Sequence, residues 1–131
     1  MSEAEHWGLM ALGVSGSWQV DLNERLTGED AWQLTVNGPL LYLGINIAKP
    51  SIVAEILGFF EATAGMCEYS EFAAGMCLGQ PLIVAKDEEF ADRYFVYMSG
   101  AETTCRFTLF GADLAHLRDA LRQVLADIPS V

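Results

Sequence analysis

Basic residues and long apolar runs are both scarce in this chain. Seven lysines and arginines stand against 18 aspartates and glutamates in 131 residues, which gives a formal net charge of −11. A field of that sign repels a phosphate backbone, so nucleic acid is a disfavoured partner. Residues such as Asn46, Lys49 and Glu55 interrupt the apolar stretches before they reach the roughly 18 residues that a membrane span needs. We therefore expect no membrane partner.

Cysteine is scarce as well. The chain has three, Cys67, Cys77 and Cys105, and an odd number in a chain of this size forms no even disulfide framework. Such cysteines fit reduced thiols in a cytosol. Glu3 and Glu5 stand where a signal peptide would carry basic residues. The sequence therefore favours a cytoplasmic location.

Signatures of catalysis and of cofactor binding are also missing. The segment Gly13–Ser17 lacks the last glycine of a Gly-x-Ser-x-Gly nucleophile elbow, so we interpret it as a loop. The glycine patterns of dinucleotide-binding and phosphate-binding loops are absent. Asp113 and His116 suit a helix N-cap followed by a surface histidine better than they suit a metal site. We expect no cofactor and no metal, and the sequence favours a protein that is not an enzyme.

Apolar side chains are abundant. Hydrophobic residues make up 52% of the sequence, which is more than one helix-covered sheet face needs. The length suits a single domain, residues 1–131, with one core. We expect the excess of apolar surface to lie in a subunit interface.

The first half predicts three strands and a helix. Residues 17–26 alternate apolar and polar side chains with the period of a half-buried strand, and residues 32–37 do the same. A third strand is predicted at 41–47. Pro50 suits the first position of a helix, and Gly65 suits its C-terminal end.

The second half repeats this order. Strands are predicted at 82–86, 93–99 and 103–110, followed by a helix with Asp113 as its N-cap that stops at Pro129. The apolar residues of that helix form one stripe: Leu114, Leu117, Leu121, Val124, Leu125 and Ile128.

The two halves, residues 17–65 and 81–129, therefore form a pseudo-repeat, with a connector at 66–80. The predicted fold class is α+β, with two βββα pseudo-repeats forming an antiparallel sheet packed by two amphipathic helices. This order is similar in outline to the Whirly type of single-stranded-DNA-binding regulator. The resemblance covers topology over most of the chain and no motif. It implies binding through a basic surface that carries aromatic residues.

The candidate interface lies on strands that carry apolar residues at both parities, such as 94–98. Two helices can cover one face of the sheet, and a monomer would leave the other face as a large apolar patch. Self-association is the simplest remedy, and two-fold dimers are the commonest oligomers. We therefore predict a homodimer with an apolar interface that involves Tyr94, Tyr97 or their neighbours, with Tyr42 as a further candidate.

Four acidic residues cluster at a predicted turn: Asp87, Glu88, Glu89 and Asp92. Charge runs of this kind are typical of a solvated hairpin tip. The alternatives are a cation site or a docking patch for a basic partner.

Three classes of function fit these observations. The leading hypothesis is a small cytosolic, non-enzymatic module that binds another protein, or a second copy of itself, through an apolar sheet face. The second is a single-stranded nucleic-acid binder of Whirly-like topology, which a contiguous patch of Arg93, Arg106, Arg118 and Arg122 would favour. The third is an enzyme or small-ligand binder with a pocket between the sheet and the helices.

Overall fold

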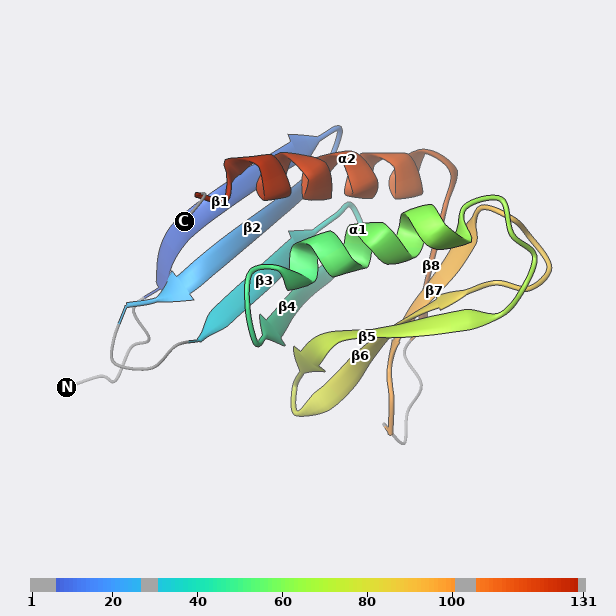
Figure 1. Cartoon of the computed structure of the whole chain (residues 1–131), viewed down its shortest axis with the longest axis horizontal. Helices are drawn as coiled ribbons and strands as arrows, with labels where there is room; N and C mark the ends of the chain where they lie inside the picture. The colour runs from blue at the N-terminus through green and yellow to red at the C-terminus, as the bar shows by residue number, and fades with distance from the viewer. Residues whose placement is uncertain (1–6, 27–30, 101–105, 130–131) are drawn as a thin grey trace.

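The computed structural model describes residues 7–26, 31–100 and 106–129. Within these ranges the chain forms one eight-stranded antiparallel sheet, with the strands side by side in chain order, and two helices (Figure 1). The first half contains β1 (Trp7–Ser15), β2 (Trp18–Arg25), β3 (Trp32–Asn37), β4 (Tyr42–Ile47) and α1 (Ile52–Thr63). The second half contains β5 (Ser70–Cys77), β6 (Gln80–Lys86), β7 (Arg93–Met98), β8 (Arg106–Phe110) and α2 (Gly111–Asp127).

The predicted fold class is confirmed: a run of strands followed by a helix occurs twice, and both helices pack on the sheet. Each half has one strand more than predicted. β1 lies in the N-terminal segment, and β5 lies in the segment predicted as a connector. Both strands contain a register shift, between Leu9 and Ala11 and between Ala73 and Gly75. A bulge of this kind interrupts the period-2 pattern by which a strand is recognised in sequence.

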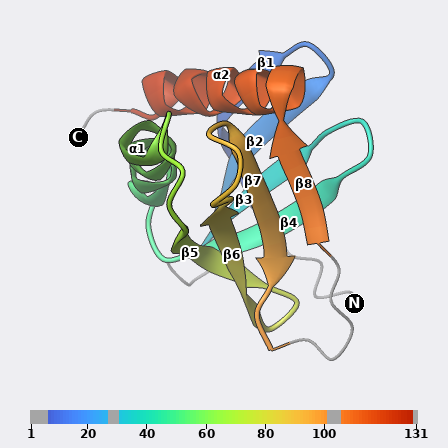
Figure 2. The ribbon, with the colours of Figure 1, turned by 90° about the vertical axis from the view of Figure 1, so that its right-hand side faces the viewer.

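The two halves join at a narrow seam. β4 and β5 share a single register pair, Asn46 with Met76, and Figure 2 shows the strands of the two halves running in different directions. Gly75 permits this crossing, because a Cβ at that position would lie 2.5 Å from the carbonyl oxygen of Asn46. The sheet therefore bends where its backbones approach most closely.

Both helices pack on the same face of the sheet and against each other. The buried face of α1 includes Ile56 and Phe60, and that of α2 includes Leu117 and Leu121. α2 lies directly on β1, since a Cβ on Gly13 would come 1.9 Å from the carbonyl oxygen of Ala120. Neither helix in the described ranges is long and apolar enough to span a membrane.

The start of α2 differs from the prediction. The helix begins at Gly111 with Phe110 as its N-cap, because β8 runs directly into it. Asp113 is not the N-cap; it lies in the first turn, where its Oδ1 accepts a hydrogen bond from Trp18 Nε1 at 3.1 Å. Most of the predicted apolar stripe is buried, whereas Leu125 is 38% exposed.

Leu121→Ala should lower the free energy of unfolding by about 2–5 kcal/mol, because it empties a core leucine site where the side chain is 2% exposed. The matched control is Leu125→Ala, which removes the same atoms from the exposed side of the helix and should cost about 1 kcal/mol or less. Urea denaturation followed by circular dichroism measures both values. Two equally small effects would mean that the stripe of α2 does not form the core.

Candidate functional site

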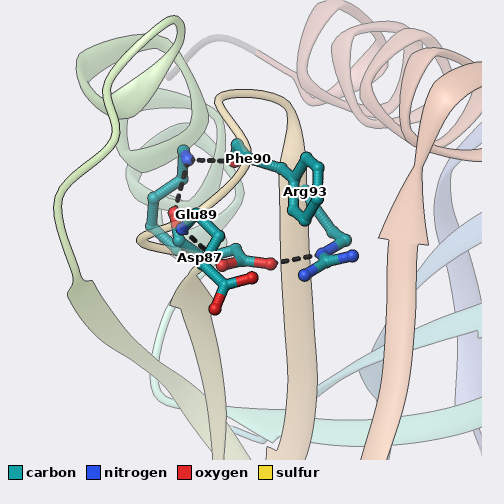
Figure 3. A network of polar contacts seen from close by, with 5 residues as sticks. Asp87, Glu89, Phe90 and Arg93 are labelled. Carbon is teal, nitrogen blue, oxygen red and sulfur yellow. Dashed lines mark hydrogen bonds and ion pairs between the residues drawn. The ribbon is translucent and has the colours of Figure 1, made fainter.

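The turn between β6 and β7 is built around a buried aspartate. Asp87 is 4% exposed. Its Oδ1 accepts a hydrogen bond from the backbone N–H of Glu89 at 2.7 Å, and its Oδ2 accepts one from Nε of Arg93 (Figure 3). The N–H of Asp87 also donates to the carbonyl oxygen of Arg93 at 3.0 Å. Asp87 therefore closes the turn and holds Arg93 in place.

These contacts hold the pKa of the Asp87 carboxyl below its ordinary value. The largest cause is the hydrogen bond from the N–H of Glu89. The guanidinium of Arg93 and the ammonium of Lys86 act in the same direction, while burial opposes them. The negative charge of Asp87 therefore interacts with groups of the turn itself.

Lys86, which precedes Asp87, is completely buried. Its Nζ donates to the carbonyl oxygens of Asp87 and Phe90, both at 2.8 Å (Figure 3), and lies 5.5 Å from the centre of the Tyr94 ring. A buried ammonium is tolerated only with such partners. Sequence reasoning missed this residue, although a lysine at the end of the apolar run Leu82–Ala85 was a usable signal.

An open cleft of about 460 Å³ adjoins this turn and lies over β6, β7 and β8. Its lining combines aromatic, acidic and basic side chains, including Tyr69, Phe95, Tyr97, Glu88, Glu89, Arg93 and Arg106. The guanidinium Cζ of Arg106 lies 4.2 Å from the centre of the Phe95 ring, and that of Arg93 lies 5.6 Å from it. Two cations from neighbouring strands therefore converge on one aromatic ring.

Two tyrosines form another wall of the cleft. The hydroxyls of Tyr69 and Tyr97 both donate to Oε2 of Glu71, at 2.6 and 3.3 Å. The hydrogen bond to this carboxylate is the main reason that the pKa of Tyr69 lies above its ordinary value. The pair of rings is therefore held by one acidic side chain.

The structure separates the four acidic residues that the sequence analysis grouped. Glu88 and Glu89 are exposed and line the cleft. Asp87 is buried and is not available to a partner. Asp92 lies in a different depression, together with Phe90 and Phe110.

The three tyrosines of the predicted interface are also divided. Tyr94 is 2% exposed and belongs to the core, where its hydroxyl lies 2.6 Å from Oγ1 of Thr63. Burial raises the pKa of Tyr94. Tyr42, which is 71% exposed, and Tyr97 line an apolar depression of about 140 Å³ together with Phe107. Strand parity explains the difference, because residues 94 and 97 point to opposite faces of β7.

The two outer edges of the sheet differ. At β1, Oδ2 of Asp127 accepts a hydrogen bond from Leu12 N–H at 3.1 Å. Gln123 accepts one from Val14 N–H at 2.9 Å and donates to the Val14 carbonyl oxygen at 2.7 Å. β8 pairs with β7 only, and no side chain in the described part of the chain bonds its outer edge. An open edge of this kind can pair with another strand.

Ser15 and His116 form a polar contact between β1 and α2. The Oγ of Ser15 lies 2.8 Å from Nδ1 of His116, and the imidazole packs so closely on Gly16 that a Cβ there would come within 2.8 Å of it. The predicted loop at 13–17 is therefore the end of β1 and a turn. Asp113 bonds Trp18, and neither Ser15 nor His116 lines the two clefts described above. The pair pins the β1–β2 turn to α2.

By residue type, the candidate metal ligands of this sequence are His6, Cys67, Cys77, Cys105, Asp113 and His116. Among the residues that the structure describes, no group of three or more histidine, cysteine, aspartate or glutamate side chains is placed to hold a metal ion. Cys67 is exposed and Cys77 is buried, and both are free thiols. His6 and Cys105 lie outside the described residues.

The four arginines that would favour nucleic-acid binding lie on two different parts of the fold. Arg93 and Arg106 meet at Phe95 on β7. Arg118 and Arg122 belong to α2, which packs on the helix-covered face of the sheet. The contiguous patch that would have favoured the second hypothesis is therefore not formed by these four residues.

Comparisons with protein-family models, with curated proteins and with solved structures found no match to this chain. The likeness in outline to the Whirly type stays an expectation from strand order.

Asp87→Asn should destabilise the protein at neutral pH and flatten its stability profile in acid. The folded state lowers the pKa of Asp87, so the carboxylate stabilises the fold above its unfolded-state pKa, and this contribution is lost as the pH falls through the lower folded-state pKa. Urea midpoints of wild type and variant should differ most above about pH 5 and converge as the pH falls through the lowered folded-state pKa of Asp87.

The control for this prediction is Asp92→Asn, which removes an exposed carboxylate from the same turn. Its urea midpoint should stay close to that of wild type at every pH. A gap between wild type and Asp87→Asn that is constant from neutral pH to acid would contradict the role given to the Asp87 charge.

Proposed function

We propose that this chain is a protein-interaction module that binds by adding a strand to the open edge of β8, and that its partner is a second copy of the chain. The observation that carries the proposal is the asymmetry of the sheet. At the β1 edge, Gln123 and Asp127 bond the backbone of Val14 and Leu12, whereas the edge at β8 has no partner within the described residues. Strand addition supplies affinity through main-chain hydrogen bonds.

The direction of the β8 backbone groups follows from the neighbouring strand. Arg93 accepts a hydrogen bond from Asp87, and Ser99 donates one to Pro81, so the odd-numbered residues of β7 direct their backbone groups toward β6. The even-numbered residues therefore bond to β8, through the register pairs of Tyr94 with Leu109 and of Val96 with Phe107. At the free edge, therefore, Arg106, Thr108 and Phe110 direct their backbone N–H groups outward.

A second copy complements this edge when the two β8 strands run antiparallel around Thr108. Each Thr108 then exchanges both backbone bonds with Thr108 of the second copy. The N–H of Phe110 donates to the carbonyl oxygen of Arg106 across the interface, since the Phe110 carbonyl serves the first turn of α2. Both backbone groups of Thr108, the N–H of Phe110 and the carbonyl oxygen of Arg106 are thereby paired without any rearrangement of the strand, while the N–H of Arg106 at the beginning of β8 is left to solvent.

The side chains of β8 suit the same register. On one face, Arg106 comes opposite the exposed ring of Phe110, and Thr108 comes opposite itself. Threonine pairs are favourable across strands, and no like charges meet. On the other face Phe107 comes opposite Leu109 of the second copy, whose side chain is buried in its own core. The pairing has two-fold symmetry, which is the commonest form of self-association.

We propose a cytosolic setting for the module. Cys67 is exposed and free, and Cys77 is buried and free. Thiols in these states are typical of reducing compartments.

Thr108→Pro should abolish self-association, because it removes an outward N–H and none of the bonds to β7. Sedimentation velocity should give wild-type protein a mass that rises with concentration to twice the 14.3 kDa of one chain, while the proline variant stays at one chain mass. Added salt should strengthen the wild-type dimer, because it screens the repulsion between two chains of charge −11.

Thr108→Val is the matched control, since it keeps the N–H and the shape of the side chain. It should dimerise like wild type, and thermal melts of both variants check that they are folded. A dimer that survives Thr108→Pro would mean that a different surface is used. A wild-type mass of one chain at every concentration would contradict the proposal.

Cysteine cross-linking tests the register in a background with Cys67→Ser and Cys105→Ser. Thr108→Cys should form a disulfide-linked dimer on oxidation, because hydrogen-bonded antiparallel pairs place their Cα atoms about 5.5 Å apart, within disulfide range. Arg106→Cys and Phe110→Cys should each stay uncross-linked alone and cross-link when mixed, as read on a non-reducing gel.

Cross-linking of Arg106→Cys with itself, without cross-linking of Thr108→Cys, would show that β8 pairs in a different register. Absence of cross-links in all of these samples would contradict pairing of the two β8 strands.

A further inference from the structure

The cleft beside the β6–β7 turn contains charges that the fold itself does not neutralise. Arg93 is paired with Asp87. Arg106 stacks on Phe95 and has no carboxylate partner within the described residues. A guanidinium that is ordered on an aromatic ring keeps its hydrogen-bond donors free for an anion.

Glu88 and Glu89 place free negative charge in the same cleft. Both are exposed, and neither side chain has an ion-pair partner within the described residues. They lie on the β6–β7 turn, whereas Arg106 lies at the beginning of β8, opposite Tyr97. The free charges of the cleft are therefore of both signs and come from different elements.

A ligand of one charge satisfies only part of this arrangement. An anion alone meets the repulsion of Glu88 and Glu89, and a cation alone leaves the guanidinium of Arg106 without a partner, because Arg93 is already paired with Asp87. The aromatic side chains of Phe95 and Tyr97 line the same cleft, and Phe95 lies on β7 between Tyr97, the register partner of Arg106, and the β6–β7 turn. A complementary ligand has opposite charges at its two ends and an apolar middle.

We propose that the cleft binds a small amphoteric molecule, with its anionic group against Arg106 and its cationic group against Glu88 and Glu89. The apolar middle lies over Phe95 and Tyr97. The cleft volume of about 460 Å³ falls within the range of sites for small molecules. This site uses side chains above the sheet, whereas the proposed self-association uses the backbone edge of β8. Arg106 takes part in both, so Glu88 and Glu89, which lie on the β6–β7 turn, are the residues that separate the two proposals.

A matched series of three probes tests the proposal. 6-Aminohexanoate has a carboxylate and an ammonium group joined by an alkyl chain, hexanoate lacks the ammonium group, and hexylamine lacks the carboxylate. In titrations followed by amide chemical shifts, 6-aminohexanoate should bind about tenfold or more tightly than either control, because each charged hydrogen-bonded contact adds to the affinity. The shifts should centre on Phe95, Tyr97 and Arg106.

Variants assign the two ends of the ligand. Arg106→Gln should weaken 6-aminohexanoate to the level of hexylamine and leave hexylamine unchanged. The double variant Glu88→Gln and Glu89→Gln should weaken 6-aminohexanoate to the level of hexanoate. Arg122→Gln, which removes an exposed charge from α2, is the control and should change nothing.

Each alternative outcome overturns the proposal. Equal binding of all three probes would mean that the charges of the cleft do not select the ligand. Shifts centred away from the cleft would place the binding elsewhere. A preference for 6-aminohexanoate that survives both the Arg106 and the glutamate variants would exclude these residues as the anchors, and sedimentation of the same samples separates this result from any change in self-association.

Discussion

The fold depends on how Trp18 joins its two halves. This side chain is 1% exposed. Its ring meets Phe107 of β8 edge-on, with the ring centres 6.3 Å apart, and its Nε1 donates to Asp113 of α2. Gly38 leaves room for it, since a Cβ there would lie 2.7 Å from the indole. One residue at the start of β2 thus holds the beginning of β8 and the first turn of α2 against the first half.

The position of α2 has consequences at both edges of the sheet. The helix covers β1 so closely that Gln123 and Asp127 reach the backbone of that strand and satisfy it. α2 starts immediately after β8 and crosses to the other end of the sheet. It therefore protects the distant edge and leaves the adjacent one open. The proposed interaction at β8 follows from this asymmetry.

Charged side chains are used in two ways around the β6–β7 turn. The charged groups of Lys86, Asp87 and Arg93 form hydrogen bonds or ion pairs within the fold. Because these residues order the turn, Glu88 and Glu89 are presented beside the aromatic surface at Phe95. Buried charges that are fully paired specify local structure more than they add stability. Here they shape a cleft whose remaining charges are free.

Local patterns in the sequence determined the α+β class, the cleanly alternating strands and the apolar stripe of α2, because period and turn chemistry are properties of neighbouring residues. β1 and β5 were not predicted as strands, because a bulge in each interrupts the alternation of apolar and polar residues. Tyr94, Asp87 and the four arginines were grouped by type, and only the tertiary structure decided which of them are buried, paired or divided. The hydrogen bonds between α2 and the edge of β1 could not be predicted from the sequence. Val14 and Gln123 are 109 residues apart, and no local pattern encodes a contact at that separation.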